Sequence, residues 1–532
     1  MHTFPKLIGR KPSLENLEMT ERPLLARLST ISPPVTLAIA IFVTFLSWSI
    51  ASPPGSTPDE AYHVGNAWCV FGESNDCTIL NSTEGGYRWA RVPFSVDLCF
   101  KRGPEIPASC IADQRPDTQV VPIDNVTRMY PPHFYVVGNL LLSLFRDGGI
   151  LALRIFNGAL FAALLAVALR LATRAVQRAL VATTLIFLVP QGIFLVASVN
   201  PSSWSFTGVL TSWAFLATFF ARFQEGKTSA SRVALCCWVL SIVISAARYD
   251  SLVYSAVLSI AVTVSHVRWL WGRAKPFLVG VGLISITSIF LARGFLNSIT
   301  RRTIDMFSDP GFFSFARYWL IHYLEIPFTS MGLNYGTYGP TGSLDVLTPP
   351  LVGHIQFALL AGALFWGLRE RNRLQRVFLS SFLVVLYFLI LQEVSRSHET
   401  GFYLVQGRYF LPFMAGSVGI VLAASSSRTS LLDFPALRSL IVGFVSIANA
   451  LALFAIVRRY SYGTTNDYKR FEIDVDKNFS LPDGWRYVSF LSPRAVLIGG
   501  SIAFAIATWM IVTMLNTDDE PDKPSERLVQ ET

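Results

Sequence analysis

The chain has 532 residues, of which 52% are hydrophobic and only 15% are charged, and its formal net charge is +9. A soluble domain carries about 25% charged residues, so this composition excludes an ordinary water-soluble fold. A basic chain can bind nucleic acid, but here the basic residues stand in short clusters between apolar runs, which is typical of membrane topology. We therefore expect the lipid bilayer, and no nucleic acid, as a partner.

Apolar runs recur along the whole chain. A helix needs about 20 mostly apolar residues to cross a bilayer. The sequence predicts an all-α polytopic membrane protein with about twelve spans, near residues 35–51, 149–169, 179–198, 203–221, 231–247, 251–267, 276–294, 350–368, 377–393, 409–424, 438–457 and 494–515.

The predicted organisation has three parts. Residues 1–34 form a basic arm, residues 35–515 form the transmembrane domain, and residues 516–532 form an acidic tail. The first apolar run begins too far into the chain for a cleavable signal peptide, so we expect the first helix to remain as an anchor.

Basic residues gather in the connections that are expected on one side of the membrane. These residues are Arg170, Arg174 and Arg178; Arg222, Lys227 and Arg232; Arg268, Arg273 and Lys275; and Arg369, Arg371, Arg373 and Arg376. Because Lys and Arg concentrate in cytoplasmic loops, both termini are predicted to lie in the cytoplasm, beneath a plasma or inner membrane. This assignment treats the apolar segment 131–145, which is short for a span, as a juxtamembrane helix on the outer face.

The segments predicted on the outer side are long. They cover about 52–148, 295–349, 394–408 and 458–493. Irregular backbone cannot face lipid, so these segments are expected to form a cap of loops and juxtamembrane helices over the outer helix ends. We expect the function to lie in this cap.

Four of the six cysteines lie in the first outer segment, namely Cys69, Cys77, Cys99 and Cys110. Clustered cysteines in a non-cytoplasmic loop are typical of disulfides. Three connectivities exist, and we prefer the pairing of neighbours, Cys69 with Cys77 and Cys99 with Cys110. A zinc site is the competing interpretation, although the spacings differ from the close ligand pairs of ordinary zinc sites.

Two adjacent carboxylates follow the first predicted span, in the run TPDEAYH. Repulsion between neighbouring carboxylates and partial burial favour a raised pKa for one of them, and such a group can take a proton from a sugar hydroxyl. Asp59 and Glu60 are therefore candidate catalytic residues, with His63 lining the substrate. The pair is also a candidate oxygen ligand set for a divalent cation. The structural alternative is a helix start, where acids suit the positive end of the dipole.

An arginine stands where a late outer segment enters the span near 409–424, in the run QGRYFLP. The guanidinium of Arg408 offers a planar fork of donors that suits a phosphate, and Gln406 and Tyr409 are candidate lining residues. The structural alternative is an arginine that snorkels to the interface beside an aromatic belt.

A second candidate for phosphate binding is Arg248, in a short outer turn of sequence RYD. Ionisable groups at membrane depth are expensive and often functional. The alternative is a simple ion pair between Arg248 and Asp250.

Three further residues are candidates for lining the substrate. Tyr130 and His133 open the predicted juxtamembrane helix, where proline suits the first turn, and the alternative is a membrane anchor. His398 lies in a later outer segment, where nothing in its spacing singles it out.

Five motifs, taken in chain order, resemble a known family. They are PDE at 58–60, YPP at 130–132, LRIFN at 153–157, SVNP at 198–201 and QGRYFLP at 406–412. Over about residues 35–425 the set resembles the bacterial membrane family catalogued as domain of unknown function 2142. The PDE run is shared with the wider C-type glycosyltransferase superfamily, the GT-C fold.

The resemblance implies a GT-C-like fold with juxtamembrane helices in the first outer loop. It implies a polyprenyl-phosphate or polyprenyl-diphosphate sugar donor, with a carboxylate of that loop as base or metal ligand. By position the base is Asp59, with Glu60 as its neighbour. The role of Arg408 at the donor phosphate follows from its chemistry. No cofactor is assigned, and a divalent cation is the one candidate.

The chain departs from the family pattern at two places. Ser202 follows the SVNP run where an aspartate is usual, and a lysine-proline-proline-tyrosine run is expected near residues 248–250. Both departures weaken the case for a role of the turn that holds Arg248.

The leading prediction is an inverting glycosyltransferase that moves a sugar from the lipid-linked donor to a cell-envelope glycan, glycolipid or protein on the outer face. Such a transfer needs a base on one side of the sugar and cations around the departing phosphate. The alternatives are a transporter or flippase for a lipid-linked or polar substrate, and a non-catalytic envelope-assembly protein.

Overall fold

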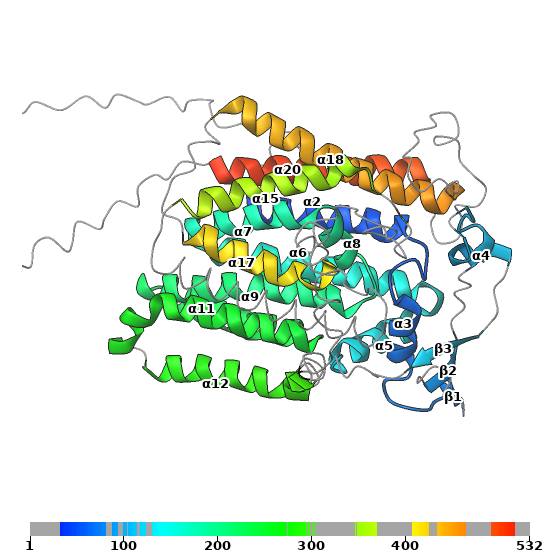
Figure 1. The fold of residues 1–532 in the computed structure, drawn as a ribbon, viewed down its shortest axis with the longest axis horizontal. Coiled ribbons are helices and arrows are strands. Elements are labelled where there is room, and N and C mark those ends of the chain that lie inside the picture. The colour runs from blue at the N-terminus through cyan, green and yellow to red at the C-terminus, as the bar shows by residue number, and fades with distance from the viewer. Residues whose placement is uncertain are drawn as a thin grey trace, which may run out of the picture.

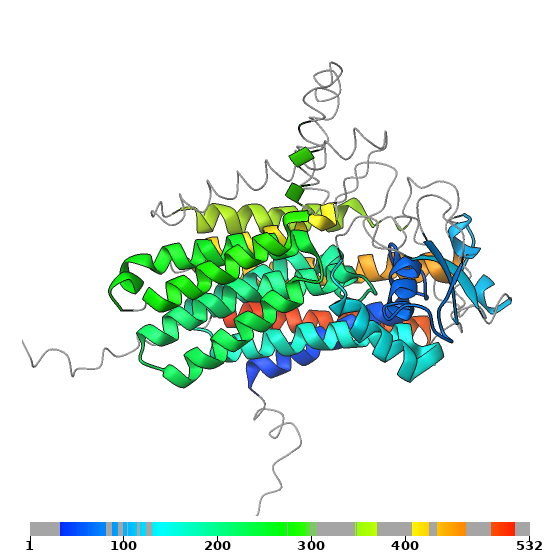
Figure 2. The same cartoon turned by 90° about the horizontal axis from the view of Figure 1, so that it is seen from below.

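The computed structural model describes residues 32–80, 88–93, 99–103, 105–113, 118–123, 130–273, 275–294, 348–369, 407–424, 434–463 and 491–516, with a few isolated positions between them. Long helices run side by side in one bundle, and a group of small elements stands beyond one end of it (Figure 1). The view turned by 90° shows the same arrangement (Figure 2). We call the end that carries the small elements the cap end.

Seven helices of the described chain are long and apolar enough to cross a bilayer. They are α2 (Pro33–Ala51), α6 (Gly149–Leu171), α9 (Pro201–Gln224), α10 (Thr228–Ser245), α15 (Pro350–Gly367), α18 (Pro435–Tyr462) and α20 (Pro493–Asn516). Helices α11 (Tyr249–Arg273), α12 (Lys275–Leu291) and α17 (Leu411–Ala423) also belong to the bundle. The all-α polytopic fold is therefore confirmed.

One predicted span is a broken helix. The apolar run 179–198 forms α7 (Arg174–Phe187), a π-helical turn η4 (Leu188–Gly192) and α8 (Ile193–Val196), with a bend of 88° between the two helical parts. Pro190 lies at the break, where it lacks an amide hydrogen for the helical ladder. Counting this pair gives at most eight spans among the described residues. The count of twelve stays a prediction, and the segment 377–393 lies outside the described residues.

Close contacts between helices depend on small side chains, as is usual where lipid surrounds a bundle. Gly208 of α9 lies against the backbone of α10 at Ser245, with no room for a Cβ atom. Beside this contact the hydroxyls of Thr211 and Ser241 are hydrogen-bonded at 2.9 Å. Thr211 and Ser241 therefore pair across this contact between α9 and α10.

Two of the predicted basic clusters lie at the end opposite the cap. Arg222, in the last turn of α9, donates to the carbonyl oxygens of Leu171 and Ala172 at the end of α6. The ends of α6 and α9 therefore meet, and the described residues of the clusters around Arg170 and Arg222 share this end. Which end faces the cytoplasm stays a prediction, as does the division into arm, domain and tail.

The cap holds short elements of the first outer segment. They are α3 (Glu60–Trp68), β1 (Thr78–Leu80), β2 (Arg88–Val92), η2 (Cys99–Lys101), α4 (Cys110–Asp113) and β3 (Gln119–Ile123). The strands form an antiparallel sheet in the order β1-β2-β3, which the sequence analysis did not predict. Disulfides join Cys69 to Cys77 and Cys99 to Cys110. The preferred pairing is confirmed, and these thiols are not available to zinc.

The segment predicted as a juxtamembrane helix forms α5 (His133–Phe145), which packs between α3 and α6. At 13 residues it is too short to span. It buries Phe134 and Leu142 and exposes the apolar side chains of Leu140 and Leu144. A short helix with one buried and one exposed apolar face suits the membrane interface.

Candidate functional site

Side chains from α6 and from the start of α9 hold the backbone between α2 and α3 by donating hydrogen bonds to its carbonyl oxygens. Arg154, in the second turn of α6, donates to the carbonyl oxygens of Ser49 at 3.0 Å, of Ser52, and of Pro53 at 3.1 Å. From the N-cap position before α9, Asn200 donates its Nδ2 to the carbonyl oxygen of Pro58 at 3.2 Å. Two motifs that are distant in sequence, LRIFN and SVNP, thus hold the backbone next to the PDE run.

Glu60 completes this scaffold. Its side chain is fully buried, and Oε1 accepts from Nε of Arg154 at 3.0 Å while Oε2 accepts from Nη2 at 2.6 Å. Oε2 also accepts from the backbone amide of Gly55 at 2.7 Å. The carboxylate therefore faces the protein interior rather than the side on which Asp59 lies. Its geometry supports a positioning role, and the catalytic role predicted from its place next to Asp59 stays a prediction.

Asp59 and Arg408 meet, although 349 positions separate them in the chain. Nη2 of Arg408 lies 3.2 Å from Oδ2 of Asp59, and the exposed fractions of the two side chains are 3% and 59%. The backbone of Asp59 is left-handed, with φ of +59°, a conformation that Asp and Asn adopt more readily than most residues. The pair combines an exposed carboxylate with a buried guanidinium whose Nε is buried without a hydrogen-bond partner.

A second arginine lies beside this pair. Arg248, in the turn between α10 and α11, binds Asp250 through Nε at 3.1 Å and Nη2 at 2.6 Å, so the structural alternative for this turn is observed. Its guanidinium lies 4.8 Å from the ring centre of Tyr409, and that of Arg408 lies 5.3 Å from the same ring. Arg248 also lies 5.6 Å from the ring of Tyr130. Cation–π contacts of this kind hold both arginines in place.

His63 is buried one turn after Asp59. Its Nδ1 lies 3.0 Å from the hydroxyl of Tyr135, its ring meets Tyr130 edge to face at 5.2 Å, and its Nε2 is buried without a partner. The pKa of His63 is lowered from 6.5 to about 3, mainly by burial; Asp59 opposes this shift, and Arg248 and Arg408 contribute to it. Burial likewise raises the pKa of the Tyr130 phenol to about 12. Both side chains are therefore neutral hydrogen-bonding groups near neutral pH.

This burial predicts a pH dependence of stability. The unfolded chain binds a proton at His63 near pH 6.5, and the folded chain binds it only near pH 3. Between these two pH values the unfolded state therefore carries more protons than the folded state. The free energy of unfolding is expected to fall by about 1.4 kcal/mol for each pH unit below 6. Thermal unfolding at pH 7 and at pH 5 measures this loss of stability. His63→Asn, which lacks the titration, is expected to show a smaller loss, and equal losses in both proteins would contradict the prediction.

The structure brings together six of the predicted site residues: Asp59, His63, Tyr130, Arg248, Arg408 and Tyr409. His133 instead packs against Trp204, with ring centres 5.7 Å apart. Gln406 and His398 lie outside the described residues. The described part of the chain holds no group of three or more His, Cys, Asp or Glu side chains that is placed to bind a metal ion, and Glu60 is committed to Arg154.

Sequence reasoning missed the residues that support the site. Arg154 and Asn200 stood inside recognised motifs, but no role was assigned to either. The signal for Arg154 was its type, because an arginine inside an apolar span needs a partner. Asn200 caps α9 by accepting from the amide of Ser202, and a cap is visible in sequence as Asn before Pro.

Comparison with known proteins gives one family. A family model described as predicted membrane protein (DUF2142) matches residues 42–416. No curated protein and no solved structure matches the chain. The match begins within α2 and ends within α17, so it includes both Asp59 and Arg408. Because it covers well over half of the sequence, the chain belongs to the DUF2142 family of predicted membrane proteins.

Proposed function

We propose that the protein is an inverting glycosyltransferase that transfers a sugar from a polyprenyl-phosphate donor to a cell-envelope glycan, glycolipid or protein. One observation carries the proposal: the exposed carboxylate of Asp59 lies 3.2 Å from the buried guanidinium of Arg408 at the cap end of the bundle. Such a transfer needs one group that accepts a proton and one that stabilises a departing phosphate. This pair offers both.

The guanidinium has capacity for an anion beyond Asp59. Arg408 uses Nη2 for the carboxylate, while its Nε is buried without a partner. A phosphate can take two parallel hydrogen bonds from one guanidinium. Donor binding then draws Arg408 toward the phosphate and releases Asp59. The sugar ring lies between the two side chains once the donor is bound.

The reaction follows from these positions. Oδ2 of Asp59 takes the proton of the acceptor hydroxyl, and the hydroxyl oxygen attacks the anomeric carbon on the face opposite the phosphate. The bond between this carbon and the phosphate oxygen breaks, and the phosphate leaves with the electron pair. Arg408 stabilises that charge. His63 is neutral near pH 7 and is suited to hydrogen-bond a sugar hydroxyl.

The side of the membrane is part of the proposal. The basic residues near Arg170 and Arg222 lie at the end opposite the cap, as expected of a cytoplasmic end. Two disulfides lie in the cap, and disulfides persist in oxidising compartments. Both features favour an extracytoplasmic site, where lipid-linked sugars meet envelope acceptors.

The test is transfer by the purified protein with a panel of polyprenyl-phosphate sugars and envelope acceptors. Arg408→Ala is expected to lower turnover by about 10²–10³-fold, because it removes charge stabilisation from the leaving group. Arg408→Lys keeps the charge but loses the fork and is expected to retain partial activity.

The matched control is Arg146→Ala, which removes an exposed arginine that is ion-paired with Asp76 at 3.0 Å. It is expected to retain full turnover. Normal turnover by Arg408→Ala would refute the assigned role, and absence of transfer from every donor in the panel by the folded wild-type protein would count against the enzyme.

A second candidate function is favoured by the broken helix. Interrupted helices line substrate paths in many transporters, and the bend of 88° at η4 is such an interruption. A transporter or flippase would move a lipid-linked or polar substrate across liposome membranes without consuming a sugar donor. The same panel in reconstituted liposomes separates the two functions.

A further inference from the structure

We infer that Arg459 and Tyr460, at the end of α18, are positioning residues for the Asp59 segment and act through the loop that the Cys99–Cys110 disulfide closes. We call these two residues, together with residues 99–103 and 105–110 of the loop, the α18 clamp. The inference rests on the proposed function for its activity readout and on geometry for the rest. The family match ends at residue 416, so α18 lies beyond it.

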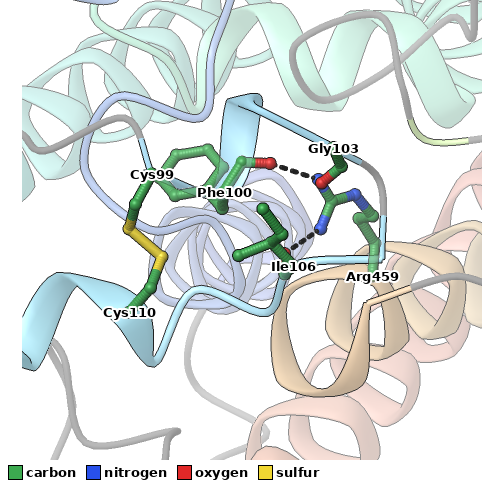
Figure 3. The surroundings of a disulfide bond; sticks show 6 residues. All are labelled: Cys99, Phe100, Gly103, Ile106, Cys110 and Arg459. Atoms are coloured by element: carbon green, nitrogen blue, oxygen red, sulfur yellow. Dashed lines mark hydrogen bonds between the residues drawn. A yellow bond between two sulfur atoms is a disulfide. The ribbon is translucent and has the colours of Figure 1, made fainter.

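Arg459 is seated in the disulfide loop (Figure 3). Its side chain is fully buried, and its guanidinium donates to three carbonyl oxygens of the loop: Ile106 at 2.8 Å, Phe100 at 2.8 Å and Gly103 at 3.3 Å. A buried charge is costly unless several hydrogen bonds compensate for it. The guanidinium therefore fixes the loop in the shape that presents these carbonyls.

Tyr460 makes the same connection from the next position. Its carbonyl oxygen accepts from the amide of Ala108 at 2.8 Å, and its ring meets Phe100 edge to face at 5.6 Å. Its hydroxyl donates to the carbonyl oxygen of Ser56 at 3.4 Å. The end of α18 thus contacts the disulfide loop on one side and the segment before Asp59 on the other.

This third contact lies between the two already described. Arg154 holds the segment at Ser52 and Pro53, and Asn200 holds it at Pro58. Tyr460 holds it at Ser56, and the segment then ends in the left-handed residue Asp59. A catalytic group must be kept within a fraction of an ångström of its working position. The clamp fixes the middle of the segment, at Ser56.

The disulfide makes the clamp rigid. It closes a loop between residues separated by 11 positions, which reduces the freedom of the open chain. Without it, the three carbonyls are no longer held together around Arg459. The expected consequence is increased motion of the Asp59 segment. The helical bundle is expected to stay folded, because the disulfide joins two residues of the cap and none of the bundle.

The experiment compares two disulfide variants. Cys99→Ser/Cys110→Ser opens the clamp, and the matched control Cys69→Ser/Cys77→Ser opens the other disulfide of the cap. Hydrogen exchange of the five backbone amides of this segment, those of Gly55, Ser56, Thr57, Asp59 and Glu60, is the first readout, and it needs no substrate. Opening the clamp is expected to raise exchange by about tenfold or more, while the control leaves it near the wild-type rate. Equal rates in the two variants would overturn the inference.

Kinetics give the second readout. Opening the clamp is expected to lower kcat while KM for the donor changes little, since Asp59 is displaced and Arg408 is not. If the double serine variant does not fold, Tyr460→Phe removes only the hydroxyl on Ser56, and unchanged exchange together with unchanged kcat in that variant would overturn the inference. If opening the clamp raises exchange but the wild-type protein transfers no sugar, the proposed function is refuted and the inference stands.

Discussion

Replacing Glu60 with glutamine is expected to lower the free energy of unfolding by about 3–5 kcal/mol. Both carboxylate oxygens are buried and bonded, to Arg154 at 3.0 and 2.6 Å and to the amide of Gly55 at 2.7 Å. Glutamine removes the countercharge of a buried guanidinium and places an NH₂ group where an acceptor is needed. Thermal unfolding in detergent measures the loss as a lower midpoint.

The matched control is Asp76→Asn, which neutralises the acid of a partly exposed ion pair with Arg146 at 3.0 Å. Exposed pairs contribute about 0–1 kcal/mol, so this midpoint is expected to stay close to that of the wild type. Equal losses in the two variants would contradict the structural role of Glu60. Arg154→Lys is a further variant of the same pair, and it is expected to be destabilised because one ammonium cannot replace a fork that serves three carbonyls.

The helices could be predicted because lipid constrains them. A bilayer-spanning segment must be long, apolar and helical, and the runs at 35–51, 149–169 and 494–515 became α2, α6 and α20. The break between α7 and α8 was missed because hydropathy carries no information on the direction of the backbone. Pro190 stands within an apolar run that reads as one span. The sheet was missed because three strands of three to five residues carry little periodic signal.

The site could be predicted in part. Charge counting placed Asp59 and Arg408 at the same end of the bundle, and the structure puts them in contact. The sequence could not show that Glu60 turns away from Asp59. Neighbouring positions at a helix start point about 100° apart, so adjacency in sequence does not give a carboxylate pair. The contact of Tyr460 with Ser56 is invisible in sequence, since the two residues lie 404 positions apart.

Converting Asp59 to asparagine is expected to lower sugar transfer by about 10²–10⁴-fold, the usual contribution of a general base, while the protein stays folded. Asparagine is the informative change because it accepts the left-handed backbone of this position, whereas alanine would add backbone strain. The measurements are transfer from a polyprenyl-phosphate sugar, donor binding and the thermal midpoint.

Asp76→Asn serves again as the control with the same chemical change, and it is expected to transfer normally. Donor binding separates two roles for the carboxylate. If Asp59 only neutralised Arg408, its removal would free the guanidinium and tighten the donor phosphate without loss of turnover. If Asp59 takes the acceptor proton, turnover is lost although the donor still binds. Loss of turnover with retained binding is the expected result, and normal turnover would refute the base.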